Sequence, residues 1–308
     1  MTKGQGGGSE GRMSDLHDLE RRARNDGAAA LSLAEARLMG DGGTPDAAAA
    51  LALVEQAARL GNADARRAWV YMTAAGIGRT ADFDAARAML AELAKEDRFA
   101  AVQLAFLGHV TCGARLAEVA PETLSDDPRI TIHRGLFSAA ECKYLMLLGT
   151  PWLERARVID EITGEGVLDA IRDADTSSFP PLAEDLVVQQ INACIAAASG
   201  TDRKWGEPLT ILRYQPGQQY RPHHDAGAKA ARQWTALIWL NDDYEGGETD
   251  FPDVRLRVKG GVGDLLLFHN VTADGSPDPR MMHAGLPVTR GVKWMASRWI
   301  RGERYLRG

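Results

Sequence analysis

The chain of 308 residues changes character along its length, and this change constrains its fold more than any other feature. From about Asp26 to Val110 the sequence is alanine-rich, with helical periodicity and almost no strand signal. From Leu209 onward, short apolar runs alternate with glycine and proline clusters, as in strands joined by turns. Many short strands after helices predict a double-sheet jelly roll flanked by helices. We therefore expect two domains, an all-α N-terminal one and a C-terminal jelly roll.

Local signals place the elements of the second domain. Ile130-Thr-Ile-His-Arg134 is typical of a short strand. The helix expected at Ser138–Leu148 begins with a capping box, in which Ser138 reaches Glu141, and a second helix is expected from about Leu182 to Ala198. Further strands are expected at 209–215, 218–224, 233–240, 254–259, 263–268, 282–288 and 292–300.

An internal similarity at a spacing of 36 residues organises the first domain. The run from Gly40 to Asp46 corresponds to the run from Gly76 to Asp82, and residues 65–71 correspond to residues 101–107. Repeats of this length, with helices separated by glycine-rich turns, predict an α-solenoid. These residues resemble about two Sel1-like repeats, which are related to the tetratricopeptide class. Such a solenoid could recruit a protein or peptide, or it could be a helical bundle that only supports the second domain.

These patterns predict the domain boundaries. The junction between the helical and strand-rich parts contains Gly113, Pro121 and the acidic pair Asp126-Asp127. We expect a flexible tail at 1–23, Sel1-like helical repeats at 24–110, a linker at 111–127 and the jelly-roll domain at 128–308.

Charge and composition exclude some partners. The net charge of −6 argues against a sequence-independent grip on nucleic acid, which needs clustered lysine and arginine. No apolar run approaches the ~20 residues that span a bilayer, and the first residues lack the apolar core of a signal peptide. The three cysteines, Cys112, Cys142 and Cys194, lie far apart, as expected of free thiols in a reducing cytosol. We expect a cytoplasmic protein, and its oligomeric state is not predicted.

Three side chains could hold one metal ion. His223 and Asp225 lie in a run that is expected to be extended, where residues i and i+2 share a face, so both can reach a common ion. His224 then points to the other face, and His283 supplies a second imidazole. Two imidazoles and one carboxylate on one side of a metal form the facial triad of non-haem Fe(II) oxygenases. The rival ligand is His269, at the end of an expected strand, and each of these residues taken alone could be structural.

More residues accompany this triad in one order, and together they carry a family resemblance. They are Tyr214, Gly217, Gly246-Gly247-Glu248-Thr249, Gly263–Phe268, Asp274–Pro279 and Lys293-Trp294 with Trp299. Roughly residues 128–308 resemble the catalytic domain of the prolyl 4-hydroxylase family of Fe(II)/2-oxoglutarate dioxygenases.

The resemblance implies a double-stranded β-helix that binds Fe(II) through His223, Asp225 and His283, with 2-oxoglutarate and O2 as cosubstrates. It also raises ascorbate as a candidate further cofactor. A related halogenating site would need a small residue in place of Asp225 to leave room for chloride, so this carboxylate favours hydroxylation.

We expect Lys293 to bind the cosubstrate. It lies in Val292–Ile300, an otherwise buried-looking strand, where a lysine is costly unless it is paired with an anion. The resemblance implies that this anion is the distal carboxylate of 2-oxoglutarate. It also implies that Tyr214 and Thr249 donate hydroxyl hydrogen bonds to the same molecule and that Trp299 walls the pocket. Ordinary strand or core packing is the alternative for these three residues.

The substrate is less constrained. Tyr220 and Arg232 match positions that contact peptide in prolyl hydroxylases, although surface exposure is the alternative for Arg232. The short loop between Asp225 and Thr235 departs from the longer loop that often closes over peptide in this family. We expect hydroxylation of a peptidyl proline or similar protein side chain, with residues 24–110 recruiting the target. The alternatives are a hydroxylase of a free amino acid or small metabolite and a non-catalytic metal-binding interaction protein. Nucleic-acid demethylation is disfavoured because it would need a basic face.

Overall fold

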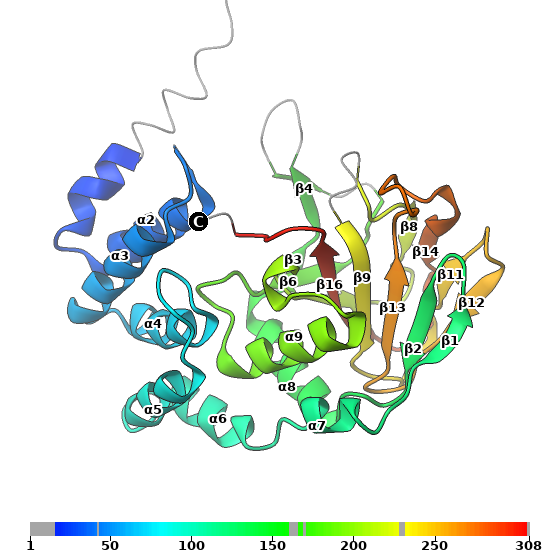
Figure 1. Ribbon diagram of the computed structural model, residues 1–308, viewed down its shortest axis with the longest axis horizontal. Helices are drawn as coiled ribbons and strands as arrows, with labels where there is room; N and C mark the ends of the chain where they lie inside the picture. The colour runs from blue at the N-terminus through cyan, green and yellow to red at the C-terminus, as the bar shows by residue number, and fades with distance from the viewer. Residues whose placement is uncertain (1–15, 42, 160–165, 169–170, 228–231, 307–308) are drawn as a thin grey trace, which may run out of the picture. The chain divides into compact units, whose positions relative to one another are not determined.

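Figure 1 shows the computed structural model, which describes residues 16–41, 43–159, 166–168, 171–227 and 232–306. The chain divides into two units, the first running to Gly108 and the second beginning at His109. The segment Pro180–Gln189 and the end of the chain from Leu306 belong to the first unit, although the sequence placed them in the second domain. Of the predicted tail, residues 1–15 lie outside the described residues, and residues 16–23 are helical.

The first unit is built from helices in which each contacts the next along the chain. Asp46 and Asp82 cap the starts of two of them 36 residues apart, each accepting a hydrogen bond from a backbone amide. Gly40 and Gly76, also 36 residues apart, end two others at φ values of 79° and 71°, which favour glycine. The helices are α2 (Gly27–Met39), α3 (Ala47–Arg59), α4 (Ala63–Ala75), α5 (Phe83–Leu93) and α6 (Arg98–Leu107).

Small side chains allow these helices to pack closely. Ala34, Ala50 and Ala68 are buried on α2, α3 and α4 and form one apolar cluster with larger neighbours. Leu182 and Leu306 pack against this cluster, so part of the apolar surface of the unit is covered by other segments of the same chain. A helical N-terminal region was predicted and is confirmed.

One stretch departs from the expectation that no apolar run could span a membrane. By length and composition alone, Arg98–Leu116 could cross a bilayer. In the structure it is divided into α6 and α7 (Cys112–Leu116), because residues 108–111 are not helical. A single stretch of this kind is only a weak indication of a membrane span.

Among the residues that the structure describes, the second unit contains two facing antiparallel sheets and two short strand pairs (Figure 1). The larger sheet has the order β1-β2-β13-β9-β16-β7-β6-β3, and the smaller has the order β12-β11-β14-β8. The larger sheet consists of β1 (Glu122–Ser125), β2 (Ile130–His133), β3 (Glu154–Arg155), β6 (Asp175–Ser178), β7 (Thr210–Tyr214), β9 (Arg232–Trp239), β13 (Leu265–His269) and β16 (Lys293–Arg301). The smaller consists of β8 (Tyr220–His223), β11 (Thr249–Phe251), β12 (Leu256–Val258) and β14 (His283–Gly285), and the pairs are β4 (Arg157–Ile159) with β5 (Gly166–Leu168) and β10 (Glu245–Gly246) with β15 (Val288–Arg290).

The core of this unit lies between the two sheets. Trp239 and Met295 from the larger sheet share one buried cluster with Val258 from the smaller. Phe251 and Phe268 meet across the sheets, with ring centroids 5.1 Å apart in an edge-to-face arrangement. The predicted C-terminal antiparallel β domain is therefore confirmed, and its two packed sheets are consistent with a jelly roll.

Helix α8 (Ala139–Gly149) and the part of α9 (Leu186–Ser199) from Gln190 onward also belong to this unit. The predicted capping box of α8 is present, because the side chains of Ser138 and Glu141 each accept a hydrogen bond from the backbone amide of the other residue. Glu141 also accepts hydrogen bonds from the amides of Thr111 and Cys112, at 3.0 Å each. The predicted start of α9 was early by about one turn, because the Asp185 carboxylate accepts from the Val188 amide and begins the helix there.

Candidate metal centre

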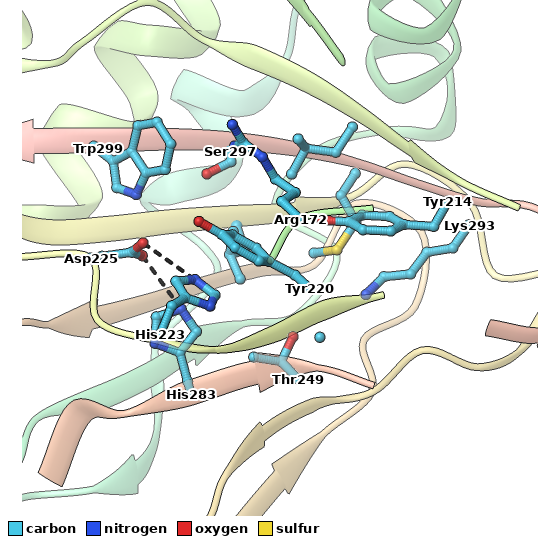
Figure 2. A pocket seen from close by; sticks show the side chains of 14 residues that line it. Arg172, Tyr214, Tyr220, His223, Asp225, Thr249, His283, Lys293, Ser297 and Trp299 are labelled. Atoms are coloured by element: carbon cyan, nitrogen blue, oxygen red, sulfur yellow. Dashed lines mark ion pairs between the residues drawn. The ribbon is translucent and has the colours of Figure 1, made fainter. Parts of the chain in front are cut away.

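His223 and His283 face one another because their strands are paired. β8 and β14 are antiparallel neighbours, and His223 stands directly opposite His283 in their register. Asp225 follows β8 by two residues, so its side chain lies on the same side as that of His223. The imidazole and carboxylate atoms that could bind an ion all lie within 4.8 Å of one another, and all three side chains are buried. The structure thus brings together the three ligands that the sequence predicted (Figure 2).

Backbone carbonyls set the proton positions of both imidazoles. The Nδ1 atom of His223 lies 2.7 Å from the carbonyl oxygen of Arg221, and that of His283 lies 3.0 Å from the carbonyl oxygen of Met281. A carbonyl oxygen only accepts hydrogen bonds, so Nδ1 carries the hydrogen in each ring. The Nε2 atoms, which face the carboxylate, are then available as metal ligands.

The Asp225 carboxylate lies between the two imidazoles. Its oxygens are 3.5 Å from Nε2 of His223 and 3.4 Å from Nε2 of His283 (dashed lines in Figure 2). Burial alone would raise the pKa of Asp225, but His283 and His223 in their protonated forms hold it well below its ordinary value through their charge and hydrogen bonds. Burial likewise favours neutral His283, yet Asp225 raises its pKa overall. Two nitrogen donors and one anionic oxygen are a donor set that fits Fe(II).

The two other histidines near this region take no part. His224 is exposed, as expected from strand alternation, whereas His223 is buried. His269 ends β13, and its ring packs against Trp234 with a centroid separation of 4.6 Å. Among the described residues, the candidate metal group contains only His223, Asp225 and His283, so the choice over His269 agrees with the geometry.

The three ligands line a pocket between the two sheets (Figure 2). Four of the residues expected to bind the cosubstrate or wall the pocket line it too, as does Tyr220, which was expected to contact substrate. The lining residues are Arg172, Leu212, Tyr214, Tyr220, His223, Asp225, Leu237, Thr249, His283, Gly285, Lys293, Met295, Ser297 and Trp299.

Lys293 is a buried cation in this pocket. It is 3% exposed, and its Nζ donates to the carbonyl oxygen of Gly247, but it forms no ion pair with the described residues. Burial lowers the pKa of Lys293 to about 7, Glu248 partly offsets this effect, and Lys259 adds to it. Because a buried ammonium is costly without a counter-ion, this position is suited to the carboxylate of a ligand.

Two aromatic rings flank the metal ligands. The Tyr220 ring stacks on the His223 ring, with centroids 3.4 Å apart and planes 16° from parallel. The Arg232 guanidinium lies over the face of the Trp299 ring, with its central carbon 3.7 Å from the ring centroid. Arg232 itself lies outside the described lining of the pocket, where Glu207 binds it through two contacts of 2.9 Å. The predicted substrate contact of Arg232 therefore remains a prediction, with its guanidinium already held by Glu207.

Sequence reasoning missed several lining residues. Met295 and Ser297 lie at every second position between Lys293 and Trp299 on β16, and so on the same face of the strand, which the strand period could have shown. Arg172 lines the pocket with its guanidinium 5.3 Å from the Tyr220 ring centre. It lies far from the other lining residues in sequence, and no local pattern indicates it. The short loop after Asp225 includes residues 228–231, which lie outside the described residues.

Comparisons with known proteins match the part of the chain that contains this site. Residues 209–301, which contain the three ligands and Lys293, match the 2OG-Fe(II) oxygenase superfamily. The chain is 35% identical to Prolyl 4-hydroxylase 1 of Arabidopsis thaliana over 208 residues, covering 61% of this chain and 74% of the relative. It is 32% identical to Probable prolyl 4-hydroxylase 10 of the same plant over 213 residues, covering 60% and 72%.

A solved structure with a likeness is the viral collagen prolyl hydroxylase of Paramecium Bursaria Chlorella virus-1 in its 2OG complex. Its sequence identity to this chain is 26%, and its TM-score is 0.46. The match covers 56% of this chain and 96% of that chain.

Replacing one of the adjacent histidines should separate the metal ligand from its neighbour. We expect His223→Ala to weaken Mn(II) binding more than about 100-fold, because a ligand is lost, and losing only a hydrogen-bond partner of a ligand often costs about 10- to 100-fold. His224→Ala should bind Mn(II) as the unmodified chain does, since this side chain is exposed. Isothermal titration calorimetry measures both, and equal weakening in the two variants would refute the ligand assignment.

Proposed function

The chain belongs to the prolyl 4-hydroxylase family of 2OG-Fe(II) oxygenases, and from this premise we propose that it hydroxylates a peptidyl proline or a similar protein side chain. It is a 2-oxoglutarate-dependent dioxygenase, with Fe(II) as its metal and 2-oxoglutarate and O2 as cosubstrates. The proposal rests above all on one observation. The His223, Asp225 and His283 group and the buried cation of Lys293 line the same pocket.

Different residues of the pocket would bind the metal and the cosubstrate. Fe(II) with 2-oxoglutarate and O2 supplies the chemistry that replaces a C–H hydrogen with hydroxyl, while 2-oxoglutarate becomes succinate and CO2. His223 and His283 would hold the metal through Nε2, and Asp225 through a carboxylate oxygen. Lys293 would hold the distal carboxylate of 2-oxoglutarate.

Other residues would orient the cosubstrate and keep water away. Tyr214 is directly opposite Lys293 in the pairing of β7 with β16, and its ring lies 5.5 Å from the lysine Nζ. Thr249 lines the same pocket, and we propose that both hydroxyls donate to 2-oxoglutarate. Leu212, Leu237 and Met295 supply apolar walls, which exclude water and strengthen the attraction between Lys293 and a carboxylate.

Aromatic faces support a proline-containing peptide as substrate. Tyr220 and Trp299 both line the pocket, and Tyr220 lies directly against the metal ligand His223. Proline-rich segments commonly dock on aromatic side chains, because the stiff ring and backbone lose little entropy on binding. Arg172 adds donors beside Tyr220 that could reach peptide carbonyl oxygens.

Incubation with a proline-rich peptide tests the substrate proposal. We expect succinate release to increase when the peptide is added, together with a mass increase of one oxygen atom on a proline. Asp225→Ala should abolish both signals, because the metal loses its anionic ligand. Hydroxylation of free proline but not of peptide would replace the proposal with the free amino acid alternative. If succinate never forms, the chain is a non-catalytic binding protein.

For the first unit, we propose that it is a solenoid of Sel1-like repeats that recruits the protein target. Its support is the equivalence of α2 with α4 and of α3 with α5, whose starts are 36 residues apart. Helix α6 also exposes two large apolar side chains one turn apart, Phe99 at 72% and Val102 at 55%. Exposed apolar residues grouped on one helix face often mark protein contacts.

A surface substitution tests recruitment without truncating the chain. Phe99→Ser should raise the KM for a protein target about fivefold, as loss of an interface residue often does. The kcat, and the KM for a short proline-rich peptide, should stay unchanged. Leu147→Ser is the matched control, because Leu147 is 64% exposed on α8 of the second unit. If both variants behave alike with the protein target, the first unit only supports the chain.

The pKa of Lys293 predicts a pH dependence of cosubstrate binding. A bound carboxylate favours the ammonium form, so binding takes up a proton once the pH exceeds the unliganded pKa of about 7. The affinity for 2-oxoglutarate is therefore highest below that pKa and decreases progressively as the pH rises above it. We expect 2-oxoglutarate to bind about tenfold more weakly at about pH 8 than at about pH 6.

Calorimetry without oxygen and with saturating Mn(II) measures this dependence. Lys293→Arg is the control, because an arginine that still binds the carboxylate keeps its charge and should show a flat profile. A flat profile in the unmodified chain would contradict the role of Lys293.

A cytoplasmic location also remains part of the proposal. Cys112, Cys142 and Cys194 are all buried free thiols, as predicted. Free thiols suit a reducing compartment, where disulfides are rare.

A further inference from the structure

We propose that Thr235 and Asn270 form a hydrogen-bond relay that positions the Asp225 carboxylate for metal binding. The inference deepens the proposed function, since it rests on Asp225 being a metal ligand. Neither residue lines the described pocket, and neither would touch substrate. Both would act through Asp225, so they are positioning residues.

The first link joins the larger sheet to the ligand. Thr235 lies on β9, between β13 and β16, and is 1% exposed. Its hydroxyl donates to Oδ2 of Asp225 at 2.7 Å. The carboxylate is thus restrained by the larger sheet, while the two imidazoles come from the smaller sheet.

The second link gives the relay its direction. The side-chain amide of Asn270 donates from Nδ2 to the Thr235 hydroxyl oxygen at 2.9 Å. An amide nitrogen can only donate, and a hydroxyl has one hydrogen. Because the Thr235 oxygen accepts from Asn270, its own hydrogen is directed to Asp225. The opposite amide orientation would draw this hydrogen toward Asn270 and leave two oxygens facing each other at 2.7 Å.

The far end of the relay is anchored to the backbone. Asn270 follows β13 and is 1% exposed. The backbone N–H of Asn270 donates to the backbone carbonyl oxygen of Gln233 at 2.7 Å. The backbone carbonyl oxygen of Asn270 accepts from the backbone N–H of Asp278 at 3.0 Å. The Asn270 side chain therefore starts from a fixed main-chain position, as a relay requires.

The relay restricts how the carboxylate can turn. A free aspartate side chain can rotate its terminal oxygens, but a hydrogen bond to Oδ2 holds the plane of the group relative to His223 and His283. Oδ1 accepts no hydrogen bond from Thr235 and stays available to a cation. Partners of this kind around metal ligands typically contribute about 10- to 100-fold to metal affinity.

Matched substitutions test the relay through metal affinity rather than turnover. Thr235→Val has nearly the same shape as threonine but lacks the hydroxyl, so Fe(II) binding measured without oxygen should weaken about 10- to 100-fold. Thr235→Ser keeps the donor and should restore affinity to within about threefold of the unmodified chain. The visible charge-transfer band of the complex with Fe(II) and 2-oxoglutarate should shift in the valine variant and return in the serine variant.

A double-mutant cycle tests the second link. Asn270→Ala should weaken Fe(II) binding by a smaller factor than Thr235→Val. Without the Thr235 hydroxyl, Asn270 no longer affects the Asp225 carboxylate. The double variant should therefore bind Fe(II) with the same affinity as Thr235→Val alone. Additive losses would overturn the relay, because they would mean that each residue acts separately.

Other outcomes also test the relay and distinguish its failure from failure of the proposed function. Unchanged Fe(II) affinity in Thr235→Val would overturn the proposal, as would equal losses in the valine and serine variants, which would indicate packing alone. If the relay variants behave as expected while no peptide is hydroxylated, the substrate proposal fails and the relay stands. If Asp225→Ala still binds Fe(II) normally, the ligand assignment and the relay fail together.

Discussion

The antiparallel register between β8 and β14 decides whether this protein has a metal centre. It places His223 opposite His283, although they lie 60 positions apart in the chain. A slip of one residue would turn one imidazole to the other face of the sheet and separate the ligands. The pairing shifts by one residue beyond His283, so that Gly285 of β14 is opposite Tyr220 of β8, and Gly285 is also opposite Thr249 of β11. Tyr220, Thr249 and Gly285 therefore line the pocket and also take part in the strand pairing beside the imidazoles.

The site places polar groups where the fold would otherwise place apolar ones. The His283 ring lies against Phe268 and Phe251, with centroids 4.9 Å and 5.5 Å away, so the centre borders the core between the sheets. Asp225 and Lys293 bring one negative and one positive charge into this region, and burying each is costly. Binding a metal beside Asp225 and a carboxylate beside Lys293 would offset these costs. Both ligands should therefore stabilise the folded chain as well as activate it.

Local patterns in the sequence predicted what depends on local physics. Strand alternation chose His223 over His224, and the capping box placed the start of α8. The expected strand at 282–288 covers β14 and only the first residue of a separate strand, β15, and these two strands pair with different partners. No periodicity could show this division, because pairing depends on contacts far apart in the chain. For the same reason Arg172 reaches the pocket without a local signal.

The two sheets contribute different parts of the site. The smaller sheet carries the imidazoles, whereas β7, β9 and β16 of the larger sheet carry Tyr214, Thr235 and Lys293. All the described lining residues belong to the second unit, so the helices of the first supply none of them. The proposed recruitment of a protein target by the helices is therefore separable from the chemistry. On that proposal, changes on the helices alter which proteins are hydroxylated, whereas changes at the sheets alter the reaction itself.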